Sequence, residues 1–227
     1  MNDKVFYFDI VGQTFLGRLA NKARTDIYQI FLDQIRPTSS SSILDVGVSV
    51  AEDNPGETSA LENVLEHLYP YPTNIKMLGV HDGAFLEERY PGTKYVRYDP
   101  AGPFPFGDEE FDVCYCNAVI EHVGRPESRR RFVRELLRVG KKVFLATPNR
   151  WYPVDFHKMI PFLHWLPQDW YRAMLGMMGD TFYSQEENLN LMTKRDLALF
   201  FGEAGVPFKI IPYRFMGFVS NLLVVAK

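Results

Sequence analysis

The chain has 227 residues, of which 46% are hydrophobic, and its formal net charge is −3. This length can bury the core of one large domain, and the mixed, slightly acidic charge argues against a nucleic-acid partner. No run approaches the ~20 apolar residues of a transmembrane helix, and the start, Met1–Lys4, lacks the pattern of a secretion signal. We therefore expect a cytoplasmic protein with a single domain over residues 1–227.

The two cysteines, Cys114 and Cys116, lie in one apolar stretch. On a strand, residues two apart share a face. Two cysteines are too few for a zinc site, and their setting does not suit a disulfide framework. We expect buried thiols and no bound metal.

The first half of the chain alternates between helical and strand patterns. Apolar residues at helical spacing predict a helix over residues 15–36, which Pro37 ends. Ser59 and Glu62 form a capping box, which predicts the start of a second helix. Strands are expected at 43–47, 76–80 and 95–98, with a helical turn at 83–89.

The second half continues this alternation and then changes it. The next elements are expected to be a strand at 111–117, a helix at 126–139, a strand at 142–146 and a helix capped by Thr193 and Asp196. Only a short link joins the last two strands, 209–214 and 221–226, so we expect an antiparallel hairpin. The whole pattern predicts an α/β fold with a doubly wound, Rossmann-like parallel sheet that ends in one reversed strand.

The first strand ends in a motif typical of nucleotide-binding folds. A strand expected to be buried through Ile43, Leu44 and Val46 brings Asp45 and Gly47 to its carboxyl end. This end lies at the edge where ligands bind in open α/β sheets. Ser49 and Ala51 stand where the second and third glycines of such a loop are expected. The motif therefore indicates a cofactor site, an altered cofactor site or a relic of one.

Further motifs follow the later strands in order: Asp99 after the third, Phe111–Val113 in the fourth, Asn117–Val123 after it and Thr147–Asn149 after the fifth. With Leu44–Gly47, they make residues 40–227 similar to the class I S-adenosylmethionine-dependent methyltransferases, and more narrowly to a methyltransferase type 11-like bacterial subgroup. The resemblance implies a sheet in the order 3-2-1-4-5-7-6 with strand 7 antiparallel. It also implies S-adenosylmethionine as the cofactor and S-adenosylhomocysteine as its product.

The resemblance assigns cofactor-binding roles to residues at the strand ends. Asp45 would orient the loop or accept a hydrogen bond from the methionine ammonium. Gly47, followed by Val48 and Ser49, would let the backbone approach the cofactor. An acid after the second strand would accept the ribose hydroxyls, and we favour Asp82, with His81 as the alternative. The other interpretation of Asp82 is a turn former.

Two further strand ends complete the implied cofactor site. Asp99 would accept from the adenine amino group, although Asp99 and Pro100 also make a common turn start. Asn117 would end the fourth strand beneath the methionine portion, and Ala118 would leave room for it.

The connection after the first strand is unusually long for this family. Because the capping box begins only at Ser59, residues 48–58 hold three acids, Glu52, Asp53 and Glu57, outside the helix. We expect this segment to fold over the methionine end, with its backbone N–H groups replacing the lost glycine turn. Unchanged S-adenosylmethionine affinity after shortening residues 52–58 would argue against this hypothesis.

Methyl transfer is an in-line attack on a sulfonium carbon, and holding the nucleophile near and aligned supplies much of the catalysis. A base is needed only where the acceptor carries a proton that must leave. The candidates are His122, Glu121, His164 and His157, the last with Asp155 positioned to orient it. His122 is best placed by its motif, and its other interpretation is a histidine that bonds a backbone carbonyl and fixes its loop.

Residues 150–192 form an insertion that contains all three tryptophans. In this fold such an insertion lies over the carboxyl ends of the strands, so we expect an aromatic substrate cap. A dimer face and a membrane-surface contact are the alternatives, since exposed aromatic surface usually has a partner.

The sequence thus predicts an S-adenosylmethionine-dependent methyltransferase that acts on a small or carrier-linked molecule, with oxygen as the acceptor atom. The alternative is a non-catalytic methyltransferase-like binding or scaffold protein, which would explain Ser49, Ala51 and the shifted acid. A nicotinamide dehydrogenase is disfavoured because its glycine fingerprint is absent. A nucleic-acid methyltransferase is disfavoured by the charge balance.

Overall fold

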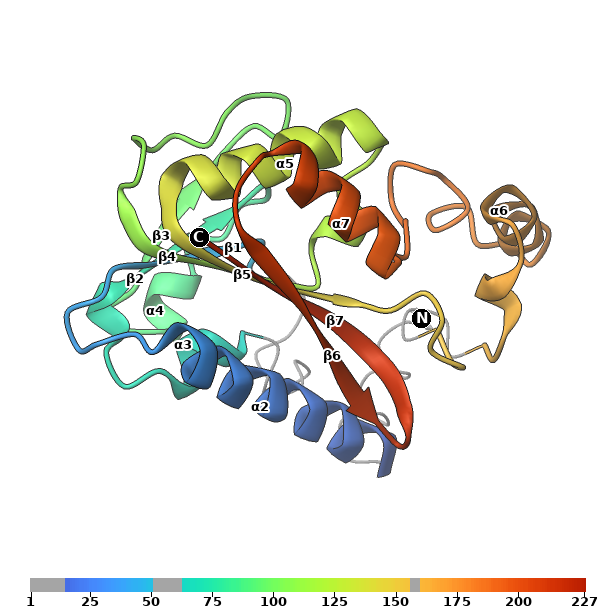
Figure 1. Ribbon diagram of the computed structural model, residues 1–227, viewed down its shortest axis with the longest axis horizontal. Coiled ribbons are helices and arrows are strands. Elements are labelled where there is room, and N and C mark those ends of the chain that lie inside the picture. Colours follow the sequence, from blue (N-terminus) through green and yellow to red (C-terminus); the bar gives the residue numbers. More distant parts are fainter. Residues whose placement is uncertain (1–14, 51–62, 156–159) are drawn as a thin grey trace. The chain divides into compact units, whose positions relative to one another are not determined.

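The computed structural model describes residues 15–50, 63–155 and 160–227 (Figure 1). The strands of these residues form one sheet in the order β3-β2-β1-β4-β5-β7-β6. Strand β7 runs antiparallel to both of its neighbours, β5 and β6, so the predicted order and the reversed last strand are confirmed. The chain divides after Pro105 into two compact units, the first carrying β1 to β3 and the second β4 to β7.

The first unit opens with the predicted N-terminal helix, α2 (Phe15–Ile35). Its buried residues include Ile27, Phe31 and Ile35, which lie four apart on one face of the helix. The helix ends one residue earlier than expected, because Arg36 adopts a left-handed conformation with φ of 52°. The Arg36 N–H still donates to the Leu32 carbonyl at 2.9 Å, which closes the last turn.

Three parallel strands follow in the first unit: β1 (Ile43–Val46), β2 (Ile75–Gly79) and β3 (Lys94–Arg97). Each residue of β1 is buried, as expected for an apolar strand covered on both faces. Pairing of β1 with β2 and of β2 with β3 is in parallel register. The carboxyl ends of these strands therefore lie at one edge of the sheet.

The helices of the first unit are short. They are α3 (Val64–Leu68), the 3-10 turn η1 (Pro72–Asn74) and α4 (Leu86–Arg89). The predicted capping box at Ser59 and Glu62 lies outside the described residues. The described helix begins at Val64, and its N-cap, Asn63, makes no side-chain cap bond, because this amide has other partners.

The second unit is built on β4 (Phe111–Asn117) and β5 (Gly140–Pro148), which pair in parallel. The helix between them, α5 (Pro126–Val139), has the predicted bounds. The Tyr115 and Phe144 rings stack at 5.7 Å between these strands. Cys114 and Cys116 are free and buried, as predicted.

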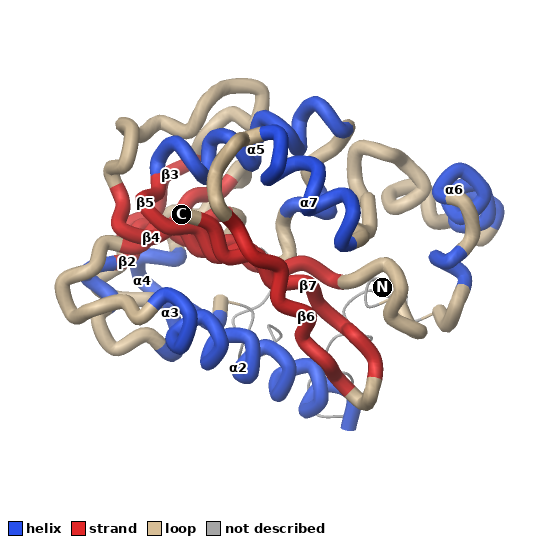
Figure 2. The backbone as a smooth tube through the Cα atoms, in the orientation of Figure 1, coloured by secondary structure: helices blue, strands red, loops and turns tan. Residues whose placement is uncertain are grey.

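The C-terminal elements are α7 (Lys194–Glu203), β6 (Phe208–Phe215) and β7 (Phe218–Ala226). The capping box of Thr193 and Asp196 is present and opens α7. Helices α5 and α7 lie side by side (Figure 1). Strands β6 and β7 form the predicted hairpin, which Figure 2 shows as two long red tubes joined by a short tan turn. Met216 and Gly217 turn it with φ of 50° and 86°, as a two-residue hairpin turn requires.

The insertion of the second unit has a small core of its own. Its elements are η3 (Leu163–Trp165) and α6 (Gln168–Met177), and η2 (Ile120–His122) precedes it after β4. Its buried cluster consists of Tyr171, Leu175, Leu189 and Leu191. Because two of these apolar side chains lie on α6 and two lie after it, the second half of the insertion packs back against α6.

Candidate active site

The turn that follows β1 has the geometry that the glycine motif predicts. Gly47 adopts φ of 87°, a region in which side chains with a Cβ are strained. Its N–H donates to the Leu78 carbonyl of β2 at 2.8 Å. Val48 is buried and Ser49 is exposed, so the backbone rises from the sheet edge immediately after the strand.

The Asn63 side chain fixes this turn from the start of α3. Its Oδ1 accepts from the Ser49 N–H at 2.9 Å, and its Nδ2 donates to the Ser49 carbonyl at 3.0 Å. One buried amide thus replaces both hydrogen bonds that a neighbouring strand would make. This contact holds the loop where the usual glycines are missing. In the sequence, the only signal for this contact is an asparagine that precedes an apolar helical run.

Removing this amide tests whether it holds the turn. Asn63→Ala should destabilise the protein by about 1–2 kcal/mol, because two backbone hydrogen bonds are lost. Affinity for S-adenosylhomocysteine should fall about tenfold, equivalent to ~1.4 kcal/mol. Urea denaturation and calorimetric titration measure the two effects.

Asn74→Ala is the matched control, because the exposed Asn74 amide donates to the Ser39 carbonyl at 2.7 Å. This control should leave the affinity unchanged. Equal effects of the two variants on affinity would show that the Asn63 contact has no particular role at the turn.

A second contact from α3 reaches Asp45 itself. Asp45 and Glu66 are each only 6% exposed. Burial, and then the charge of the Glu66 carboxyl beside it, raise the pKa of Asp45 well above its ordinary value. Burial also raises the pKa of Glu66, while its hydrogen bond to Asp45 acts in the opposite direction. In a buried pair of this kind, ionising both carboxyl groups without a nearby cation is strongly unfavourable.

The end of β2 is organised by Tyr95, a residue that sequence reasoning missed. Its hydroxyl donates to the His81 carbonyl at 2.6 Å. A Cβ on Gly79 would lie 2.4 Å from that hydroxyl oxygen, and one on Gly83 would lie 2.6 Å from the ring. With the Tyr95 side chain in this position, neither Gly79 nor Gly83 can carry a side chain.

The three acids and bases predicted at the ends of β2 and β3 are exposed. Asp82 Oδ1 accepts from the Ala84 N–H at 3.4 Å, and Asp99 Oδ1 accepts from the Ala101 N–H at 2.9 Å. Each acid therefore forms the local turn that was its other interpretation. A carboxylate has further acceptor capacity, so the assignments of Asp82 or His81 to ribose, and of Asp99 and the exposed Pro100 to adenine, stay predictions.

In the second unit, Ala118 stands at the carboxyl end of β4 in a strained conformation. Its φ is 57°, and its N–H donates to the Ala146 carbonyl at 2.8 Å. Asn117 is half-buried and Ala118 is exposed. A non-glycine residue in this region costs about 1–2 kcal/mol, and such strain concentrates at functional sites. The observation agrees with the predicted site residues without testing their role.

Glu121 is fully buried between β5 and the insertion. Its Oε2 accepts from the Thr147 hydroxyl at 2.8 Å, and its backbone carbonyl accepts from the Asn190 N–H at 2.6 Å. Its Oε1 has no hydrogen-bond partner among the described residues. With 0% exposure, this carboxyl is placed to hold η2 against β5, and its catalytic role stays a prediction.

Thr147→Val tests this buried contact. We expect a loss of about 2–3 kcal/mol in the free energy of unfolding, because the buried carboxyl loses its hydroxyl donor. The double variant Thr147→Val with Glu121→Leu should recover most of that loss, since both polar partners are then apolar. Urea denaturation measures both, with exposed Thr73→Val as the control. Additive losses in the double variant would contradict the contact.

His122 makes the backbone-carbonyl contact expected of a loop anchor, and its role as a base stays a prediction. Its Nδ1 lies 2.8 Å from the Asn188 carbonyl oxygen. A carbonyl only accepts, so Nδ1 carries the hydrogen and Nε2 is the basic nitrogen of the neutral ring. The contact therefore fixes the loop and also sets the tautomer that a general base needs.

The other candidate bases lie in the insertion. His157 lies outside the described residues. Asp155, expected to orient it, is buried and accepts from the Tyr171 hydroxyl at 2.5 Å. His164 is 2% exposed, and its Nε2 contacts the Tyr152 carbonyl at 2.7 Å. Both side chains thus contribute to the interior of the insertion.

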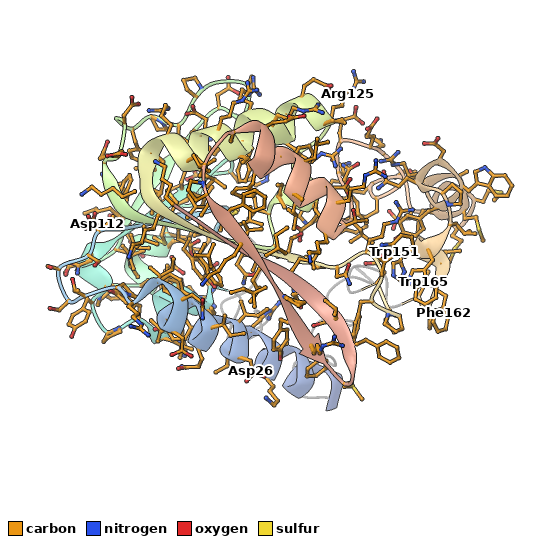
Figure 3. All side chains as sticks on the ribbon, in the orientation of Figure 1. Asp26, Asp112, Arg125, Trp151, Phe162 and Trp165 are labelled. Carbon is orange, nitrogen blue, oxygen red and sulfur yellow. The ribbon has the colours of Figure 1, made fainter. Side chains whose placement is uncertain are left out.

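The aromatic surface of the insertion is largely exposed. Trp151, Phe162 and Trp165 are 52%, 54% and 41% exposed, and Figure 3 shows them gathered at one end of the segment. The Phe162 and Trp165 rings meet edge to face at 4.8 Å. Exposed aromatic clusters of this kind mark binding surfaces, which agrees with a cap without identifying what it covers.

The sheet with its reversed strand β7, and the acid–glycine turn after β1, are the features expected of the predicted class. They are the fold and the first motif of the class I S-adenosylmethionine-dependent methyltransferases. Residues 59–143 match the family described as a methyltransferase domain. The predicted class and its cofactor, S-adenosylmethionine, are thereby confirmed.

Solved structures agree on the fold. A methyltransferase from Aquifex aeolicus is 11% identical with a TM-score of 0.56, over 98% of this chain and 96% of that chain. The 1,6-didemethyltoxoflavin-N1-methyltransferase of Burkholderia thailandensis, solved with S-adenosylhomocysteine, is 11% identical with a TM-score of 0.55, over 100% and 90%. A citrinin polyketide synthase CMeT domain is 16% identical with a TM-score of 0.56, over 88% and 51%. No curated protein matches significantly.

Within the described residues, no helix combines the length and the apolar character needed to cross a bilayer.

Proposed function

We propose that this protein is a cytoplasmic methyltransferase that methylates an oxygen of a small or carrier-linked molecule. When bound, S-adenosylmethionine would supply an electrophilic methyl group on a sulfonium. The single observation that carries the proposal is the turn after β1, where buried Asp45 leads directly into Gly47 at φ of 87°. A backbone of this shape admits a ligand close to the strand end.

The residues of the first unit fit the cofactor by their chemistry. The methionine end carries an ammonium, and among the described residues the Glu66 carboxyl has no partner beyond Asp45 and its own backbone N–H. Two buried carboxyl groups without a nearby cation suit a cationic donor. Asp82 or His81 would hold the ribose, and Asp99 the adenine. Residues 51–62 lie outside the described residues, so the closing of this loop over the methionine end stays part of the proposal.

The choice of oxygen rests on His122. A hydroxyl acceptor must lose a proton as it is methylated, and a positioned base assists this step. The Nδ1 contact with the Asn188 carbonyl leaves Nε2 as the base. Asn117 and Ala118 would leave room for the methionine portion, and the insertion would cover the acceptor.

Mass spectrometry with a deuterated methyl donor tests this function. The protein is incubated with bacterial small-molecule extract and S-adenosylmethionine bearing a CD3 group. We expect a labelled product whose CD3 group is on oxygen. A label on carbon or nitrogen would refute the oxygen assignment. Absence of S-adenosylhomocysteine binding in calorimetry would instead support the non-catalytic scaffold.

A further inference from the structure

Two residues at the start of α3 contact the end of β1 and the turn that follows it. Asn63 binds the backbone of Ser49, and Glu66 meets the carboxyl of Asp45. Asn63 is the N-cap of α3 and Glu66 lies in its first turn, so both contacts come from the start of this helix. The acid pair therefore belongs to the turn where the cofactor's methionine end is proposed to lie.

Among the residues that the structure describes, the pair of Asp45 and Glu66 has no cationic partner. Apart from Glu66, the group that changes the pKa of Asp45 is the Val46 backbone N–H, which lowers it. The pKa of Glu66 is lowered by hydrogen bonds from Asp45 and from its own backbone. No lysine, arginine or histidine of the described residues neutralises either carboxyl. Among the described residues, the Glu66 carboxyl has no donor other than the Asp45 carboxyl and its own backbone N–H. A pair of buried acids in this state keeps one proton and one negative charge.

We propose that Asp45 and Glu66 form a proton-sharing pair that accepts the ammonium of the cofactor's methionine end and releases its proton to solvent on binding. This inference rests on the proposed function. The O–H bond of the pair breaks, the proton passes to buffer, and the charge of the pair changes from one negative to two. N–H donors of the ammonium replace the O–H donor, and the cofactor undergoes no covalent change.

Two consequences follow from the charge of the pair. Raising the pH removes the shared proton beforehand, so affinity for S-adenosylhomocysteine should increase with pH by up to about tenfold per unit while the pair is protonated. The stability of the free protein should depend on pH in the opposite direction. The raised pKa of Asp45 means that the folded chain holds more protons than the unfolded chain, so stability falls as pH rises above about 4.

Calorimetric titration with S-adenosylhomocysteine at pH 7 measures the proton directly. The titration is repeated in phosphate and in Tris, whose ionisation enthalpies differ, and the difference in heat gives the number of protons released. We expect the wild type to release up to one proton. Glu66→Gln should release none and should lose the pH dependence of affinity, because its amide donates to an Asp45 that stays ionised. Exposed Glu88→Gln on α4 is the matched control and should behave as the wild type does.

Equal heats in the two buffers for the wild type, or equal proton release by Glu66→Gln, would overturn the inference while leaving cofactor binding intact. Failure of the wild type to bind S-adenosylhomocysteine would overturn the proposed function together with the inference. Where Glu66→Gln does not fold, the buffer comparison on the wild type alone decides.

Discussion

Gly47→Val should weaken S-adenosylhomocysteine binding by at least about a hundredfold, equivalent to ~2.8 kcal/mol. Gly47 has φ of 87°, and a β-branched side chain there would stand where the cofactor must approach the backbone. The strain itself costs about 1–2 kcal/mol of stability. Calorimetry gives the affinity, and thermal unfolding gives the stability.

Gly217→Val separates the two effects. Gly217 has nearly the same backbone, with φ of 86°, and nothing lies within 4 Å of a Cβ built on it. This control should lose comparable stability and bind S-adenosylhomocysteine as tightly as the wild type does. Equal affinity of the wild type and Gly47→Val would show that the turn after β1 does not contact the cofactor.

His122→Ala should lower turnover by about 10²–10⁴-fold, the usual contribution of a general base, and should leave cofactor affinity nearly unchanged. His122→Asn distinguishes a base from a loop anchor. An asparagine amide can donate to the Asn188 carbonyl as Nδ1 of the ring does, but it has no basic nitrogen. Turnover, measured as CD3 transfer from labelled S-adenosylmethionine to the product found with the wild type, decides between the two roles.

The base role requires both His122 variants to be inactive, with only His122→Ala losing stability. Recovery of turnover in His122→Asn would show that the histidine acts by fixing its loop. Full activity in both variants would remove His122 from the mechanism.

The sheet was predictable because its signals are local. The apolar runs of β1 and β4 and the short link between β6 and β7 each lie within a few residues, and each was found where expected. Strand ends were less certain. β5 extends over Gly140–Pro148, beyond the predicted 142–146. Its extra residues pair with strands that are distant in sequence: Gly140 pairs with Phe111, and Pro148 with Asn221.

The missed parts of the site are contacts between residues distant in the sequence. Asn63 with Ser49, Glu66 with Asp45 and Thr147 with Glu121 depend on how the turns return to the sheet. No periodicity or spacing relates such partners. Sequence reasoning identified the strand ends where ligands bind, because these follow from topology. It did not identify the side chains that hold those ends in place.

The central claim is that the carboxyl ends of β1 to β3 hold the cofactor, and a crystal structure with S-adenosylhomocysteine tests it most directly. We predict the methionine portion against the Gly47 turn with its ammonium at Asp45 and Glu66, the ribose at Asp82 or His81, and the adenine beside Asp99. A product molecule bound elsewhere on the protein, with the Gly47 turn unoccupied, would contradict the account.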